Sequence, residues 1–155
     1  MNDRRRFLKL GAAASVPAGA VFTVSAQAQQ NGDNQIVGAW KTTHSLPFPP
    51  FSFREFLTFH FGGGLHETNS FLHTASSLDF SVYGLPNVLN ASDGAGNWER
   101  SGHDINVVFR KMLFDGSRQN FADLKVTGVV TVTGGVLKAE WQVNVVDLED
   151  RLILP

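Results

Sequence analysis

The chain contains no cysteine, and it has no unbroken apolar run long enough to span a membrane as a helix. The missing cysteine excludes disulfide frameworks, zinc–thiolate sites and thiol catalysis. The longest mildly apolar stretch runs from Leu10 to Val24 and is interrupted by Pro17 and Gly19. A spanning helix needs about 20 predominantly apolar residues. We therefore expect no stable membrane insertion of the mature protein.

The first 28 residues have the pattern of a twin-arginine export signal. Paired arginines precede Phe7-Leu8-Lys9, an apolar stretch follows, and Ala26-Gln27-Ala28 supplies the small residues that signal peptidase requires. Such segments are removed and do not belong to the folded domain. We therefore expect a signal peptide over 1–28, a loose lead-in over 29–35 and one domain over 36–155. The protein is then periplasmic or secreted.

An excess of basic charge is also missing. The chain has 13 Lys and Arg against 14 Asp and Glu. Removing the leader takes away four basic residues and one acidic residue, which leaves a mature net charge of about −4. A mildly acidic domain without a basic run argues against nucleic acid or an anionic membrane as the main partner. The remaining length fits a single domain.

What the sequence has in abundance is alternation of apolar and polar residues, which is typical of half-buried strands. Two long alternating segments, 121–133 and 137–145, flank Gly134-Gly135 and predict a β-hairpin. A second hairpin is expected over 53–74, with its tip at 62–64. Further strands are expected over 36–45, 96–101, 104–114 and 150–154. The fold class is all-β, an up-and-down antiparallel barrel of about eight strands, since closure removes the exposed sheet edges.

Two irregular segments interrupt this meander. Residues 45–53 are rich in proline and aromatic residues, and we expect the prolines to prevent central-strand pairing there. Residues 75–96 form a long connection for a compact domain, and its apolar side chains predict that it folds over one end of the barrel, with a short helical turn. It is either a ligand lid or a plug that seals the core.

Gly38-Ala39-Trp40 resembles the G-x-W signature on the first strand of lipocalins and the wider calycin superfamily. That resemblance implies that Trp40 packs across the floor of a barrel and that an arginine covers its indole. Arg151 or Arg100 is the expected partner.

Three longer stretches, Gly38–Lys41, Leu57–Thr68 and Gly96–Gly102, are similar to those of small exported bacterial proteins described as lipocalin-like. This group implies a fold, without an assigned chemistry.

The second predicted hairpin carries the best candidates for a site. If its tip has three residues, Glu55, Glu67, Asn69 and His73 share a face with Phe53, Leu57, Phe59 and Phe71. If the tip has two residues, His66, Thr68, Ser70 and Leu72 face inward instead. Polar groups within an aromatic cavity suit the orientation of a mostly apolar ligand. Gly62-Gly63-Gly64 joins two strands, so it indicates a hairpin turn rather than a phosphate-binding loop.

These features lead to three functional hypotheses. The first is a binding protein that holds a small hydrophobic or amphipathic molecule, with Trp40 and Leu57 as ligand contacts. The second is an isomerase or cyclase that uses Glu55 or Glu67 as acid or base. The third is a barrel packed shut that serves a structural or interaction role. We expect no cofactor, and the histidines at 44, 60, 66, 73 and 103 fit no compact metal-ligand motif.

Overall fold

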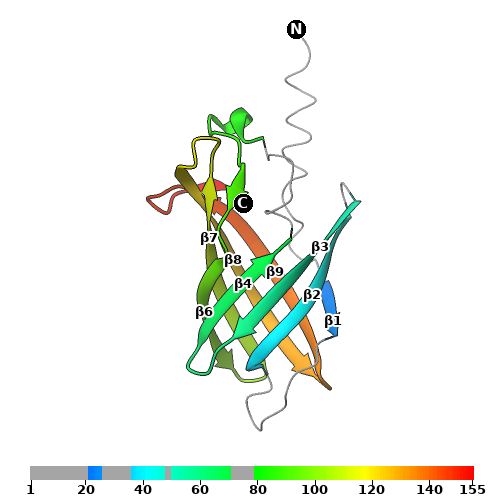
Figure 1. The fold of residues 1–155 in the computed structure, drawn as a ribbon. Coiled ribbons are helices and arrows are strands. Elements are labelled where there is room, and N and C mark those ends of the chain that lie inside the picture. Colours follow the sequence, from blue (N-terminus) through cyan, green and yellow to red (C-terminus); the bar gives the residue numbers. More distant parts are fainter. Residues whose placement is uncertain (1–20, 26–35, 48–49, 71–78) are drawn as a thin grey trace.

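The protein folds into one antiparallel β-sheet, which Figure 1 shows as a curled ribbon. The computed structural model describes residues 21–25, 36–47, 50–70 and 79–155. The strands are β1 (Val21–Ser25), β2 (Gly38–Pro47), β3 (Pro50–Phe59), β4 (Gly64–Asn69), β5 (Asn90–Ala91), β6 (Gly94–Ser101), β7 (Asp104–Phe114), β8 (Asn120–Thr133), β9 (Val136–Val146) and β10 (Leu152–Leu154). The all-β antiparallel prediction is confirmed.

The main path of the sheet is β1-β9-β8-β7-β6-β4-β3-β2, with β10 added to β9 and β5 added to β7. β1 lies beside β2 (Figure 1), yet no backbone ladder joins these two strands in the part of the chain that the structure describes. The sheet is therefore curled but not closed, and the prediction of a closed barrel is wrong on this point. The outer edge of β9 is covered instead by two short strands, β1 along Val136–Glu140 and β10 at Val145 and Val146.

Strand β1 lies within the predicted leader. Its five residues pair with β9 in continuous register from Val21 with Glu140 to Ser25 with Val136. Residues 1–20 and the lead-in at 29–35 lie outside the described residues. The cleavage site after Ala28 lies there too, so the signal peptide stays a prediction.

The β8–β9 hairpin has the predicted form. Thr133 pairs with Val136, so Gly134 and Gly135 alone form the turn. Both glycines have positive φ angles, 58° and 77°, which a two-residue turn of this hand requires and which other residues rarely adopt.

Among the described residues, no helix is both long and apolar enough to cross a membrane.

The proline-rich segment does not interrupt the sheet as expected. β2 and β3 pair from Gly38 with Phe59 to Pro47 with Pro50. Proline is tolerated here because β2 ends the sheet path and because, among the described residues, no strand residue pairs with β3 on its other side beyond Glu55. The predicted interruption is therefore wrong for 45–47 and 50–53, which lie in strands, whereas the expectation that the prolines avoid central-strand pairing is not contradicted in the described part of the chain.

The described part of the long connection, 79–96, contains the expected short helical turn. It is a 3₁₀ helix, η1 (Ser81–Tyr83), ended by Gly84 at a φ of 73°. β5 then pairs with the end of β7, and Val88 and Ala91 are buried there. The connection is thus partly built into the sheet, and η1 lies at the end of the molecule near the β7–β8 turn (Figure 1).

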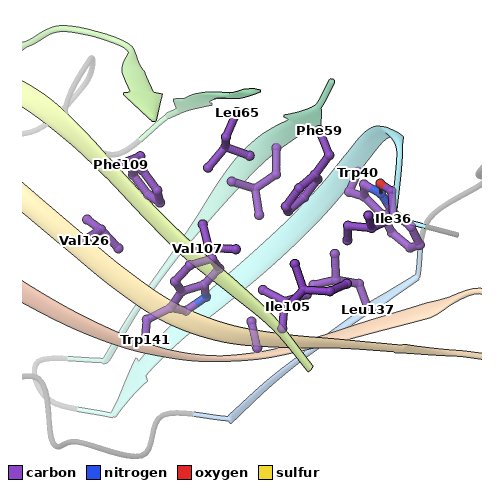
Figure 2. Packing of buried hydrophobic residues seen from close by; sticks show 13 residues of the cluster. Ile36, Trp40, Phe59, Leu65, Ile105, Val107, Phe109, Val126, Leu137 and Trp141 are labelled. Atoms are coloured by element: carbon purple, nitrogen blue, oxygen red, sulfur yellow. Dashed lines mark hydrogen bonds between the residues drawn. The ribbon is translucent and has the colours of Figure 1, made fainter. Parts of the chain in front are cut away.

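The inner face carries two apolar clusters. The larger, which we call the first core, contains Ile36, Trp40, Leu57, Phe59, Leu65, Ile105, Val107, Phe109, Val126, Val130, Leu137, Ala139 and Trp141 (Figure 2). The second core contains Val88, Ala91, Leu113, Ala122 and Val145. Along β7, Phe109 belongs to the first core and Leu113 to the second. The site described below lies between them.

Trp40 is fully buried, but the predicted arginine does not cover it. Its indole nitrogen donates a hydrogen bond of 2.7 Å to the carbonyl oxygen of Ile36. Arg151 is exposed and pairs with Asp147 at 2.5 Å and Glu149 at 2.8 Å. Arg100 is exposed as well. The indole nitrogen thus finds its acceptor locally, on a residue that lies two positions before β2 begins.

Candidate functional site

A buried polar cluster on the inner face lies between the two apolar cores along β7, while Leu124 of β8 packs against both cores. The alternating inward positions of β7 are apolar in the first core, up to Phe109, and apolar again in the second core at Leu113. Lys111 occupies the inward position between them and is 2% exposed. Because strand side chains alternate between faces, this lysine has its stem within the interior. A lysine is almost never fully buried unless it is paired.

The β3–β4 hairpin supplies the partners of Lys111. Phe59 pairs with Leu65, Leu57 with Glu67, and Glu55 with Asn69. The turn over 60–64 has positive φ angles at Gly62 and Gly63. Glu55, Glu67 and Asn69 therefore face inward, as expected for a three-residue tip, although the tip observed here spans 60–64. Glu55 and Glu67 are buried and Asn69 is half-buried, whereas His66 is exposed.

Glu67 and Lys111 form the centre of the cluster. Lys111 Nζ lies 2.7 Å from Glu67 Oε2, and Glu67 is completely buried. Asn69 Nδ2 donates a hydrogen bond of 2.7 Å to the other carboxylate oxygen, Oε1. The Nζ–Oε2 contact is a close ion pair that lacks hydrogen-bond angles, and Nζ has no other acceptor among the described residues. Donor capacity on this ammonium is therefore unused.

A second acidic group lies beside this pair. His44 Nε2 is 2.6 Å from Glu55 Oε2, and both side chains are about 6% exposed. Thr42 Oγ1 donates to Glu55 Oε2 at 3.1 Å and lies 2.7 Å from His44 Nε2. The His44 ring stacks on Phe53 with a centroid separation of 4.7 Å. The cluster therefore contains two carboxylates, one ammonium and one imidazole.

The environment raises the pKa of Glu67 above its ordinary value of 4.5. Burial is the largest cause, because it disfavours the charged carboxylate. The ammonium of Lys111 opposes this effect, and the negative charge of Glu55 adds to it. The close contact of Lys111 and the hydrogen bond from Asn69 also lower the pKa, without reversing the direction. Glu67 is thus a carboxyl group that retains its proton more readily than one in water.

Gly94 on β6 makes room for the Glu67 side chain. Glu67 and Gly94 are cross-strand partners, and a Cβ on Gly94 would lie 2.6 Å from Glu67 Oε2 and 2.8 Å from Phe109 Cδ2. The β4–β6 ladder ends at this pair. The cluster therefore lies where the ladder between these two strands stops.

The structure places the expected ligand contacts in different surroundings. Leu57 is the cross-strand partner of Glu67 and so lies next to the polar cluster. Trp40 lies in the first core, against Ile36 (Figure 2). His73 and Phe71 lie outside the described residues. The described part of the chain contains no group of three His, Asp or Glu side chains arranged to hold a metal ion.

Three cluster members were not identified from the sequence: Thr42, His44 and Lys111. Their signal was present in the alternation of their strands. Lys111 follows Ile105, Val107 and Phe109 at the next inward position of β7. Thr42 and His44 follow Trp40 in the same way on β2. A polar residue at an inward strand position is a candidate for a site; β7 contains one and β2 contains two.

Comparison with known proteins gives no further assignment. The chain matches no family model, and neither the curated proteins nor the solved structures contain a match to it.

Proposed function

We propose that this chain is an exported, lipocalin-like protein that holds a small hydrophobic or amphipathic molecule on the inner face of its curled sheet. The observation that carries the proposal is the buried Lys111–Glu67 pair, which lies with the buried side chains of Thr42, His44 and Glu55 between two apolar cores. Binding sites for small molecules are mostly apolar and contain a few polar groups that orient the ligand. The cluster has this composition, with an apolar core on either side.

A contribution to stability does not by itself explain why Lys111 and Glu67 form a buried ion pair. Removing two charges from water costs so much that an apolar pair of similar volume is often as stable or more stable. The unused donor capacity of Lys111 adds a further cost. A ligand that accepts a hydrogen bond from Nζ would recover this cost in the bound state. The pair therefore supports a role in orienting a ligand.

Native mass spectrometry of the protein purified from an exporting bacterium tests the binding proposal. We expect a population with a discrete added mass that is lost when the protein is unfolded. The unfolded sample serves as the control, because a covalent modification would remain. A single unliganded mass, together with no binding of a neutral apolar dye, would contradict the proposal.

The raised pKa of Glu67 favours one second candidate, an isomerase or cyclase with this carboxyl as its acid or base. In that case Glu67→Gln abolishes turnover while the ligand still binds. In a binding protein the same change alters affinity alone. Mass analysis of the bound molecule before and after incubation separates these outcomes, since an enzyme converts the ligand.

The leader makes a separate prediction about processing. We expect the amino terminus of the exported protein to be Gln29, which amino-terminal sequencing of the periplasmic fraction measures. Replacement of Arg5 and Arg6 by lysine should block export, so that the uncleaved protein accumulates in the cytoplasm. Arg54→Lys, at an exposed position of β3, is the control and should still be exported and cleaved. An exported protein that retains Val21–Ser25 would contradict cleavage after Ala28 and would keep β1 on β9.

A further inference from the structure

We infer that the polar end of the bound molecule is an uncharged oxygen acceptor, a ketone, aldehyde or hydroxyl, which receives a hydrogen bond from Lys111 Nζ, and that it is not a carboxylate. This inference rests on the proposed binding function and specifies the class of ligand for that site.

The first reason is the donor that Lys111 leaves unused. Its ammonium group carries three N–H bonds and has no acceptor function. Nζ contacts Glu67 Oε2, and no other acceptor among the described residues receives a hydrogen bond from it. The side chain is 98% buried, so solvent at the surface is not its ordinary partner. A buried donor without an acceptor is costly, and an oxygen atom of the ligand would satisfy it.

The second reason is the balance of charge. The cluster already holds two carboxylates, Glu55 and Glu67, and the negative charge of Glu55 is felt at Glu67. The imidazole of His44 is in contact with Glu55, which leaves Lys111 facing Glu67. A carboxylate ligand would bring a third acid into the same low-dielectric region, where like charges repel strongly. A neutral oxygen adds no charge and uses the same donor.

A cationic ligand is disfavoured for the complementary reason. Glu55 already contacts His44 and Thr42, and Glu67 already contacts Lys111 and Asn69. A ligand ammonium would have to approach Lys111 and would displace one of these partners. The surroundings fit an apolar chain instead, because Phe109 of the first core and Leu113 of the second core flank Lys111 along β7.

Probes that share one chain length and differ in their polar end test this inference. Decan-2-one, 1-decanol, decanoate and decylamine are each titrated at pH 7 against the full chain carrying a neutral fluorescent dye, N-phenyl-1-naphthylamine. We expect the ketone and the alcohol to displace the dye at concentrations about tenfold or more below those of decanoate and decylamine, because each charged probe must bring a further charge into the buried cluster.

The Lys111→Met/Glu67→Leu double variant removes the donor and its partner together, so no buried charge is left alone. In this variant we expect the affinity for decan-2-one to fall about tenfold or more. The affinity for 2-methyl-1-decene, which replaces the carbonyl oxygen by a methylene group, should not change. Lys138→Met, an exposed lysine on β9, is the matched control and should leave both affinities unchanged.

The outcomes separate the two proposals. Tightest binding of decanoate or decylamine, or equal binding of all four probes, overturns the inference about the polar end and leaves interior binding intact. Failure of every probe and of the dye to bind overturns the proposed function itself. An unchanged affinity for the ketone in the double variant also overturns the role of Lys111.

Discussion

Replacing Lys111 by methionine should lower the free energy of unfolding at pH 7 by about 3 to 5 kcal/mol, the range for breaking one partner out of a buried ion pair. The loss arises because Glu67, which is completely buried, must either stay charged without the ammonium 2.7 Å away or take up a proton at pH 7, and both cost free energy. Methionine has a similar volume, so little of the loss comes from a cavity. Urea unfolding at pH 7, extrapolated linearly to water, measures it.

The loss should depend on pH in a direction that the pKa of Glu67 determines. A carboxyl whose pKa is raised in the folded protein binds its proton more tightly when folded, so its contribution is present below the unfolded value of about 4.5 and is lost as pH rises through the folded value. Without Lys111 the opposing charge is gone, and the pKa of Glu67 rises further. We therefore expect the variant to approach the parent protein in stability toward acid pH and to fall behind it as pH rises.

Two controls distinguish this account from a general effect of losing a lysine. The Lys111→Met/Glu67→Leu double variant should recover most of the stability, because an apolar pair replaces an ionic one. Lys138→Met should change the free energy of unfolding by no more than about 0.5 kcal/mol, since the side chain is exposed. A single Lys111→Met variant as stable as the parent at pH 7 would show that the pair is not buried as described.

Replacing Gly96 by alanine should destabilise the sheet by at least about 3 kcal/mol, the upper part of the usual range for overpacking. Gly96 pairs with Phe109, and a Cβ at Gly96 would overlap the carbonyl oxygen of Val108 and lie 2.5 Å from Phe109 Cα. Both are backbone atoms, so a change of rotamer cannot relieve the overlap. β6 and β7 must move apart beside the polar cluster. Thermal and urea unfolding both measure the loss.

Gly116 offers the matched control for this variant. It lies in the β7–β8 connection, and a Cβ there has no neighbour within 4 Å. Gly116→Ala should therefore change the free energy of unfolding by no more than about 0.5 kcal/mol. If Gly96→Ala and Gly116→Ala behave alike, then β6 does not approach β7 as closely as described, and the first core is looser than Figure 2 shows.

The strands and most of their turns were predictable from the sequence because alternation and glycine positions are local signals. The β8–β9 hairpin, with Gly134 and Gly135 at its turn, is one example. Closure was not predictable, since it depends on which strands meet at the two ends of the sheet. The error at Pro47 and Pro50 has the same origin: a proline forbids pairing only where a neighbour requires its missing N–H.

The site was predictable in part. The alternation of side chains along β3 and β4 predicted that Glu55 and Glu67 share the inner face if the hairpin tip has an odd number of residues. The observed pairing of the two strands agrees with that alternative. The partner of Glu67 comes from β7, and the pairing of distant strands decides which inward residue of β7 faces it. Lys111 could therefore be recognised as an inward lysine, but its contact with Glu67 could not be read from either strand alone.

The two short strands on the outer edge of β9 have a consequence for the order of folding. β8 and β9 are joined by a two-residue turn, so their pairing requires little loop-closure entropy. Val21, in contrast, must find Glu140 from far away in the sequence. Contacts of such high sequence separation form slowly. The hairpins built from local turns should therefore form first, and the pairing of β1 with β9 should be among the last steps, after β9 has been synthesised.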